Sequence, residues 1–308
     1  MVKIRLFGRC ALESDATVIQ DINCAKAREL LGYLACRRDR HLSREAVIGA
    51  LWGDMQEEQG KRALRQTLWQ VQSALTPFQI TASNPLIETD SEWIRLNLNS
   101  GIWLDVARFE ELEMSTRLVS GELPTPAHTS KLKEAIALYR GPLMEDCFKD
   151  WCILQRDLLR HQYLRMLQRL MRCQRKSADF DGAMATALTL LREEPASENA
   201  HLTVMWLYHR EGDRTSALRQ FEQYKRILRE ELNAPPAKVV VDLNNKIRDD
   251  VGQKKEDWTD VETARIESFV DKVLSLLEQI RNEMSQNRQD IEEVKDSIDK
   301  KNSDEQKK

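Results

Sequence analysis

The chain has 308 residues, of which 41% are hydrophobic and 31% charged, with a net charge of −3. This composition allows a substantial buried core and two or three domains, and it excludes a protein that is basic overall. No apolar run reaches the roughly 20 residues that span a bilayer, and the N-terminus lacks the apolar stretch of a secretory signal, so we expect a cytoplasmic protein without a membrane segment.

The first hundred residues predict a mixed domain. Residues 2–22 alternate loosely and indicate short strands, with turns near Gly8 and Ser14. Helices are predicted over 26–37, from the N-cap Ser43 onward, and over 57–75, ending before Pro77. Strands at 78–80, 86–87 and 93–98 follow, the last two paired as a hairpin. Strands, three helices and a hairpin predict a winged helix-turn-helix over residues 1–100.

The helix expected at 57–75 carries the clearest functional pattern. Its apolar residues fall at alternating spacings of four and three and therefore share one face: Leu64, Leu68, Val71 and Leu75. The other face and its flanks carry candidates for DNA base contacts: Arg62, Arg65, Gln66, Trp69 and Gln70. Arginine can pair bidentately with guanine and glutamine with adenine, although a solvated amphipathic helix would show the same pattern.

Positive charge is local rather than global. Residues 26–44 hold six cations against two anions, and residues 61–75 hold three cations and no acid. The candidates for contacts to DNA phosphates are the following: Lys26, Arg28, Arg37, Arg38, Arg40, Arg44, Lys61 and Arg95. The hairpin itself is acidic, with Glu88, Asp90 and Glu92, and acids beside phosphates repel.

Residues 101–250 predict a helical domain. A helix is expected at 104–118, entered through Asp105, followed by a loop with Pro124 and Pro126 and then by helices from Lys131 to Asp250. Asp179 and Ala183 recur as Asp213 and Ala217, 34 residues later. This is the tetratricopeptide period, which predicts stacked helix pairs and a groove for proteins or peptides.

The C-terminal region has the most regular periodicity. Apolar residues alternate spacings of four and three over about five heptads, interrupted by one amide, and form this predicted seam: Ile266, Val270, Val273, Leu277, Ile280, Met284, Asn287, Ile291, Val294 and Ile298. We expect a linker at 251–260, a coiled coil at 261–300 and a disordered tail at 301–308. The partner helix is a second copy of the chain or, alternatively, the chain's own repeat domain.

Catalytic and metal-binding patterns are missing from the sequence. It contains no phosphate-binding glycine loop, nucleophile elbow or zinc-protease motif, and the cysteines form no C-x-x-C pair. We therefore expect neither an enzyme nor a cofactor, and no metal site.

Four stretches carry a resemblance to a known family. They are HLSREAVIGALWGD followed by KRALRQTLWQVQSAL, WLDVARFEEL, LYRGPLMEDCFKDWCILQRDLLRHQYLRML, and EGDRTSALRQFEQYKRILREELNAPP. In order and spacing, residues 1 to about 250 resemble SARP-type bacterial transcriptional regulators, in which a winged helix is fused to a bacterial transcriptional activator domain of tetratricopeptide type.

The resemblance implies a mainly α fold and DNA binding through the helix at 61–75. Arg62, Arg65, Gln66 and Thr67 match positions on the family's recognition helix, whereas Gln70, Gln72 and Ser73 stand where members often carry arginine. Members typically bind repeated sites on double-stranded DNA as dimers and activate transcription through RNA polymerase.

Two functions follow from these observations. The first is a DNA-binding transcriptional regulator, dimerised by the coiled coil, whose repeat domain contacts RNA polymerase or another protein. The second is a protein-protein adaptor that retains the winged-helix fold but has lost sequence-specific DNA binding, as the acidic hairpin and the absent arginines suggest.

Overall fold

The computed structural model describes residues 2–14, 17–22, 24–38, 40–75, 85–97, 101–117 and 125–249. The chain divides into two compact units, Met1–Pro235 and Pro236–Lys308. The expected strand at 78–80, linker, coiled coil and tail lie outside the described residues. Among the described residues, no helix is long and apolar enough to cross a membrane.

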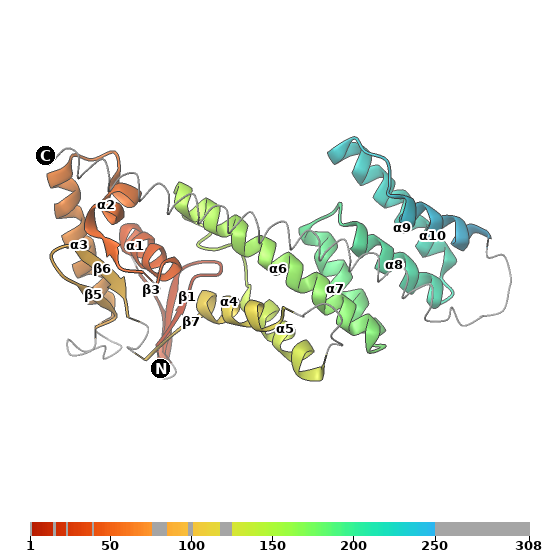
Figure 1. The fold of residues 1–308 in the computed structure, drawn as a ribbon, viewed down its shortest axis with the longest axis horizontal. Coiled ribbons are helices and arrows are strands. Elements are labelled where there is room, and N and C mark those ends of the chain that lie inside the picture. The colour runs from red at the N-terminus through yellow and green to blue at the C-terminus, as the bar shows by residue number, and fades with distance from the viewer. Residues whose placement is uncertain are drawn as a thin grey trace, which may run out of the picture. The chain divides into compact units, whose positions relative to one another are not determined.

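The first part of the chain contains two small sheets and three helices (Figure 1). The strands are β1 (Val2–Arg5), β2 (Ala11–Ser14), β3 (Thr17–Asp21), β4 (Leu42–Ser43), β5 (Ile87–Thr89), β6 (Trp93–Leu96) and β7 (Ile102–Leu104). The helices are α1 (Ala25–Cys36), α2 (Arg44–Trp52) and α3 (Glu57–Leu75). One sheet has the order β3-β2-β1-β7 and the other β4-β6-β5. The antiparallel β5–β6 pair is the predicted hairpin, so this part is a winged helix.

The second part is helical. Its elements are α4 (Asp105–Ser115), α5 (Pro126–Leu138), α6 (Asp150–Lys176), α7 (Phe180–Glu193), α8 (Glu198–Arg210), α9 (Arg214–Ile227), the π-helical turn η3 (Leu228–Leu232) and α10 (Lys238–Asp249), which belongs to the second unit. The prediction that Pro126 lies in a loop is wrong. Pro126 is the first residue of α5, because a missing N–H costs nothing there, and Thr125 caps the helix.

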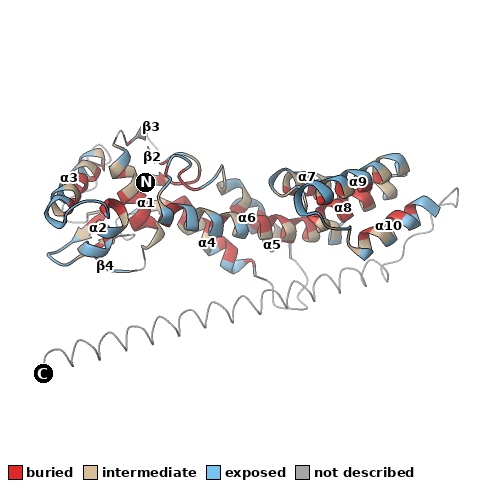
Figure 2. Ribbon diagram, turned by 90° about the horizontal axis from the view of Figure 1, so that it is seen from above, coloured by how far each residue is buried: buried red, intermediate tan, exposed pale blue. Residues whose placement is uncertain are grey.

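The 34-residue repeat appears as two equivalent turns. Asp179 accepts a hydrogen bond from the backbone N–H of Gly182, and Asp213 accepts one from that of Ser216, so both aspartates cap the helix that follows. Ala183 in α7 and Ala217 in α9 are fully buried. Figure 2 shows buried stretches in both helices. The sequence period therefore corresponds to a repeated helix pair, as predicted.

A buried carboxylate joins the winged helix to the helical part. Asp105, at the start of α4, is 1% exposed and accepts hydrogen bonds from the backbone N–H groups of Leu6, Phe7 and Val106 at 2.7–3.0 Å. Burial raises the pKa of Asp105 to about 6, although the three N–H groups and Arg5 act in the opposite direction. Asp105 thus fixes β1 against the β7–α4 junction.

The same junction is reinforced by backbone bonds and aromatic rings. The segment before α6 pairs with the turn after β1, since Gly8 N–H donates to Pro142 O at 2.9 Å and Met144 N–H donates to Leu6 O at 2.8 Å. Phe7 packs on Phe109 and Tyr139, with ring centroids 5.0 and 4.9 Å away. The winged helix and the helical part consequently share one hydrophobic core.

Candidate nucleic-acid interface

Helix α3 presents its polar face outward. Leu64, Leu68, Val71 and Leu75 are all buried, as the spacing predicted. Arg62, Arg65 and Gln66 are exposed, and none of the three forms an ion pair or a side-chain hydrogen bond with a described residue. The helix therefore exposes two arginines and a glutamine to solvent.

Local packing fixes the direction of this face. Ser43 caps α2 by accepting a hydrogen bond from Ala46 N–H at 3.1 Å, as predicted. A Cβ on Gly60 of α3 would lie 2.5 Å from Ile48 of α2, so only glycine allows this close approach of the two helices. Because the buried side of α3 packs against α1 and α2, its polar side faces solvent.

Two residues near this face are turned away from it. Thr67, which the resemblance placed among the recognition positions, is buried, and its hydroxyl donates to Ala63 O at 2.8 Å. The Gln70 side chain is half-buried and accepts a hydrogen bond from the Cys24 thiol, just before α1, at 3.0 Å. Both side chains serve the fold of the winged helix.

Most candidates for phosphate contacts have intramolecular partners. Lys26 pairs with Glu29 at 2.6 Å, Arg28 with Asp146 at 3.0 Å, and Arg38 with Glu110 at 2.7 Å. The guanidinium of Arg37 lies 4.1 Å from the ring centroid of Tyr33. The cations of α1 and of the two residues that follow it therefore hold the winged helix together and join it to α4 and the segment before α6.

The remaining candidates surround α2, α3 and the hairpin. Arg44 donates to Asp90 O at 2.9 Å, and Arg95 pairs with Glu88 across the β5–β6 hairpin. Lys61 pairs with Glu57 at 2.5 Å, an exposed contact that opens easily in solvent. Arg40 is exposed and forms no ion pair with a described residue.

The hairpin turn is organised by acids. Asp90 accepts hydrogen bonds from the backbone N–H groups of Glu92 and Trp93 at 2.7 and 2.8 Å, which shapes the turn between β5 and β6. Asp90 and Glu92 are both exposed. This wing carries negative charge where a DNA backbone contact would require positive charge.

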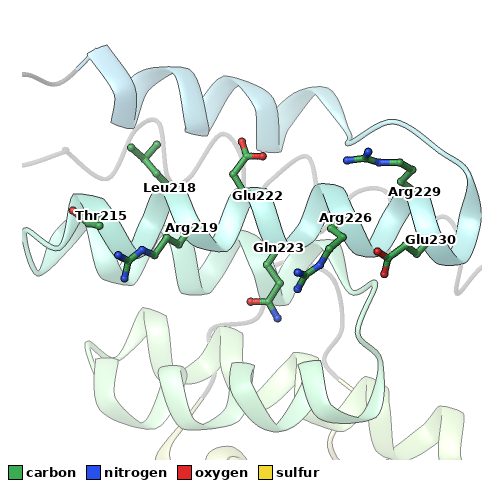
Figure 3. Close-up of a pocket in the computed structure, with 8 residues that line it drawn as sticks. All are labelled: Thr215, Leu218, Arg219, Glu222, Gln223, Arg226, Arg229 and Glu230. Carbon is green, nitrogen blue, oxygen red and sulfur yellow. The ribbon is translucent and has the colours of Figure 1, made fainter.

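The helical part offers a second polar surface. A hollow of about 760 Å³ lies along α9 and η3, and Figure 3 shows its side chains: Thr215, Leu218, Arg219, Glu222, Gln223, Arg226, Arg229 and Glu230. Glu222 pairs with Lys225 at 3.0 Å, whereas the three arginines form no ion pair with described residues. Such a surface suits a ligand with carboxylates or phosphates.

The helical part also contains a buried charge cluster. Glu113 of α4 is 1% exposed and lies 2.8 Å from Arg117, 3.7 Å from Arg165 and 3.4 Å from Arg169. Burial acts to raise the pKa of Glu113, but the hydrogen bond and charge of Arg117, with Arg169 and Arg165, lower it overall. In the described ranges, no group of three or more His, Cys, Asp or Glu side chains could hold a metal ion.

Comparison with known proteins agrees with this architecture. The sequence profile described as Bacterial transcriptional activator domain matches residues 104–248. The fold is similar to that of Mycobacterium tuberculosis EmbR, solved in complex with a low-affinity phosphopeptide, with a TM-score of 0.67 and 17% identity. The match covers 82% of this chain and 66% of that one. The TPR2B domain of yeast Sti1, solved in its complex with pHsp70, matches with a TM-score of 0.31 and 15% identity. That match covers 46% of this chain and 97% of the other. No curated protein matches.

These findings define the class of protein: a winged helix followed by a bacterial transcriptional activator domain in residues 104–248. The family match supports the activator domain that the sequence motifs indicated in residues 104–248, and the solved structure shares the fold that the resemblance to SARP-type transcriptional regulators implied.

Proposed function

We propose that this chain is a DNA-binding transcriptional regulator, acting as an activator, that reads bases through α3. The observation that carries the proposal is the outward face of α3, where Arg62, Arg65 and Gln66 have no described partner. Arginine and glutamine on one helix face match the donor and acceptor pattern of guanine and adenine in the major groove.

Binding would rely on α3 more than on the wing. The acidic β5–β6 turn cannot lie against phosphates without repulsion, and Arg28 and Arg38 already have partners. Arg40 and Lys61 remain available for backbone contacts, because the former has no described ion pair and the latter has only exposed ones. We therefore expect few phosphate contacts and a weak dependence of affinity on salt.

The test is selection of DNA sites from a random duplex library by the full chain. An enriched repeated motif is expected, and it should disappear in the variant Arg62→Ala/Arg65→Ala. The matched control, Arg219→Ala/Arg226→Ala, removes the same charge from α9 and should leave the enriched motif unchanged. Loss of enrichment in both variants would assign binding to general charge and contradict base reading by α3.

We also propose that the C-terminal seam dimerises the chain. Substituting Leu277→Glu/Ile280→Glu in the seam should halve the mass measured by light scattering. Ser275→Glu/Asn282→Glu, outside the seam, adds the same charge and should leave the mass unchanged. A monomeric wild-type protein would contradict this part of the proposal.

The adaptor function remains the second candidate. It is favoured by the acidic wing and by the intramolecular pairs of Lys26, Arg28, Arg38 and Arg95. In that case the hollow on α9 would bind an acidic segment of another protein, and a folded, dimeric sample would enrich no DNA motif. In the regulator, the same hollow would contact RNA polymerase or a regulatory protein.

A further inference from the structure

Among the tryptophans that the structure describes, one differs from the others. Trp69 of α3 is 67% exposed and makes no ring or cation contact with a described residue. Every other described tryptophan has such a contact: Trp52 with Lys26, Trp93 with His41, Trp103 with Arg5, Trp151 with Tyr33, and Trp206 with Phe180. The fold therefore does not use the Trp69 indole for packing.

The position of Trp69 is set by its neighbours. Leu68 and Val71 are buried, which holds this turn of α3 against the core and directs Trp69 outward. Trp69 follows Arg65 by four residues and Gln66 by three, so the three side chains share one exposed face. At 1.5 Å per residue, Trp69 lies about 6 Å along the helix from Arg65.

The chemistry of the major groove limits what an indole can recognise there. Polar base edges are matched by arginine and glutamine, whereas the thymine 5-methyl group is the apolar feature that the bases present in this groove. Base pairs follow one another at about 3.4 Å, so a contact by Trp69 falls about two base pairs from the base read by Arg65.

We propose that Trp69 is a specificity-determining residue that selects thymine by packing its indole on the 5-methyl group in the major groove. This inference rests on the proposed function, since it requires α3 to lie in that groove. It adds a preference that Arg62, Arg65 and Gln66 do not supply, because thymine and uracil differ only in the methyl group.

The experiment compares two duplexes of one sequence recovered from the site selection, one with thymine and one with deoxyuridine at every thymine position. Burying a methyl group favours binding by about fourfold, so the wild-type chain should bind the thymine duplex about fourfold more tightly, or more if two methyls are covered. Trp69→Ala should bind the thymine duplex more weakly and show no difference between the two duplexes. Trp69→Phe should keep part of the difference.

Matched controls separate this proposal from the proposed function. Met114→Ala removes another exposed apolar side chain, on α4, and should leave the preference for thymine unchanged. Equal binding of both duplexes by the wild-type chain, with Arg62→Ala/Arg65→Ala still abolishing binding, would overturn the role of Trp69 alone. A wild-type preference that Trp69→Ala retains would also overturn it. If no duplex is recovered by the folded wild-type chain, the proposed function fails and this inference fails with it.

Discussion

Arginines serve opposite purposes in two regions of this molecule. On α3, Arg62 and Arg65 face outward without a described partner. Between α4 and α6, Arg117, Arg165 and Arg169 converge on the single buried carboxylate of Glu113. The same side chain is exposed in the first region, where we propose that it binds DNA, and is a structural element in the second.

The difference shows that a count of charges does not give the charge available for binding. Residues 26–44 are the most basic stretch of the N-terminal part, yet Arg28 and Arg38 contact Asp146 and Glu110, far along the chain. The partners of a cation are set by the tertiary fold. A DNA-binding surface therefore has to be judged from the cations that remain unpaired.

The largest expected effect concerns the buried cluster around Glu113. Glu113→Gln should lower the free energy of unfolding by about 3–5 kcal/mol, because it removes the buried negative charge on which Arg117, Arg165 and Arg169 converge. Urea denaturation measures this loss. Glu111→Gln, which breaks an exposed pair with Arg108, should cost less than about 1 kcal/mol; equal losses in both variants would contradict the difference between the regions.

Asp105 differs from Glu113, because it is a buried carboxylate with no arginine paired to it among the described residues. Its pKa is raised to about 6 in the folded chain from 3.8, so folding favours its protonated form. Its stability contribution is complete below about pH 4 and is lost as the pH rises through about 6, a change of about 3 kcal/mol. We expect the stability of the wild type relative to Asp105→Asn to fall over this window in urea titrations at several pH values. A constant difference would contradict the raised pKa.

Substitution of the unpaired arginines on α3 should change the affinity for DNA and not the stability of the fold. Arg62→Ala/Arg65→Ala should raise the Kd for the selected duplex by about 100-fold, since each bidentate base contact is worth about 1–3 kcal/mol. The thermal midpoint should stay unchanged, because neither side chain has a described partner to lose. Fluorescence anisotropy and calorimetry test the two statements, and a destabilised variant would show that these arginines are structural.

Arg38 should behave as a paired arginine although it lies in the basic stretch. Its guanidinium contacts Glu110 at 2.7 Å in a largely buried pair, so Arg38→Ala should lower stability by about 1–2 kcal/mol. DNA affinity should change less than threefold in the anisotropy assay. A tenfold loss of affinity without a loss of stability would move Arg38 into the DNA-binding surface.

The smallest effect is a stabilising one, in the repeats. Gly212 and Ala178 occupy equivalent positions 34 residues apart, and both have positive φ, 83° and 58°. Glycine adopts this conformation without strain, whereas alanine does not, so Ala178→Gly should raise stability by about 0.5–1 kcal/mol. The reciprocal change Gly212→Ala should lower it, and calorimetry on both variants tests the equivalence of the two turns.

Much of the fold could be predicted because it depends on local patterns. The apolar spacing in α3, the Ser43 cap and the repeat of Asp179 and Asp213 are properties of short stretches, and each appears in the structure as predicted. The start of α5 was missed because Pro126 was interpreted as a loop signal, although proline is also favoured at the first position of a helix.

The candidate site could be predicted only in part. The exposure of Arg62, Arg65 and Trp69 followed from helical periodicity. The burial of Thr67, the contact of Gln70 with Cys24 and the ion pairs in and directly after α1 could not be derived. They depend on which distant elements pack against α1 and α3. Long-range contacts of this kind leave no periodic signal in the sequence.

The parallel pairing of β1 with β7 also has an evolutionary consequence. The first strand of the chain is completed by residues 102–104, and Asp105 then ties the next helix to Leu6 and Phe7. A recombination event that exchanged only the first hundred residues with those of a relative would separate β1 from the strand and the carboxylate that hold it. Successful shuffling of winged-helix modules between proteins of this architecture should therefore retain β1 and the β7–α4 junction from the same parent.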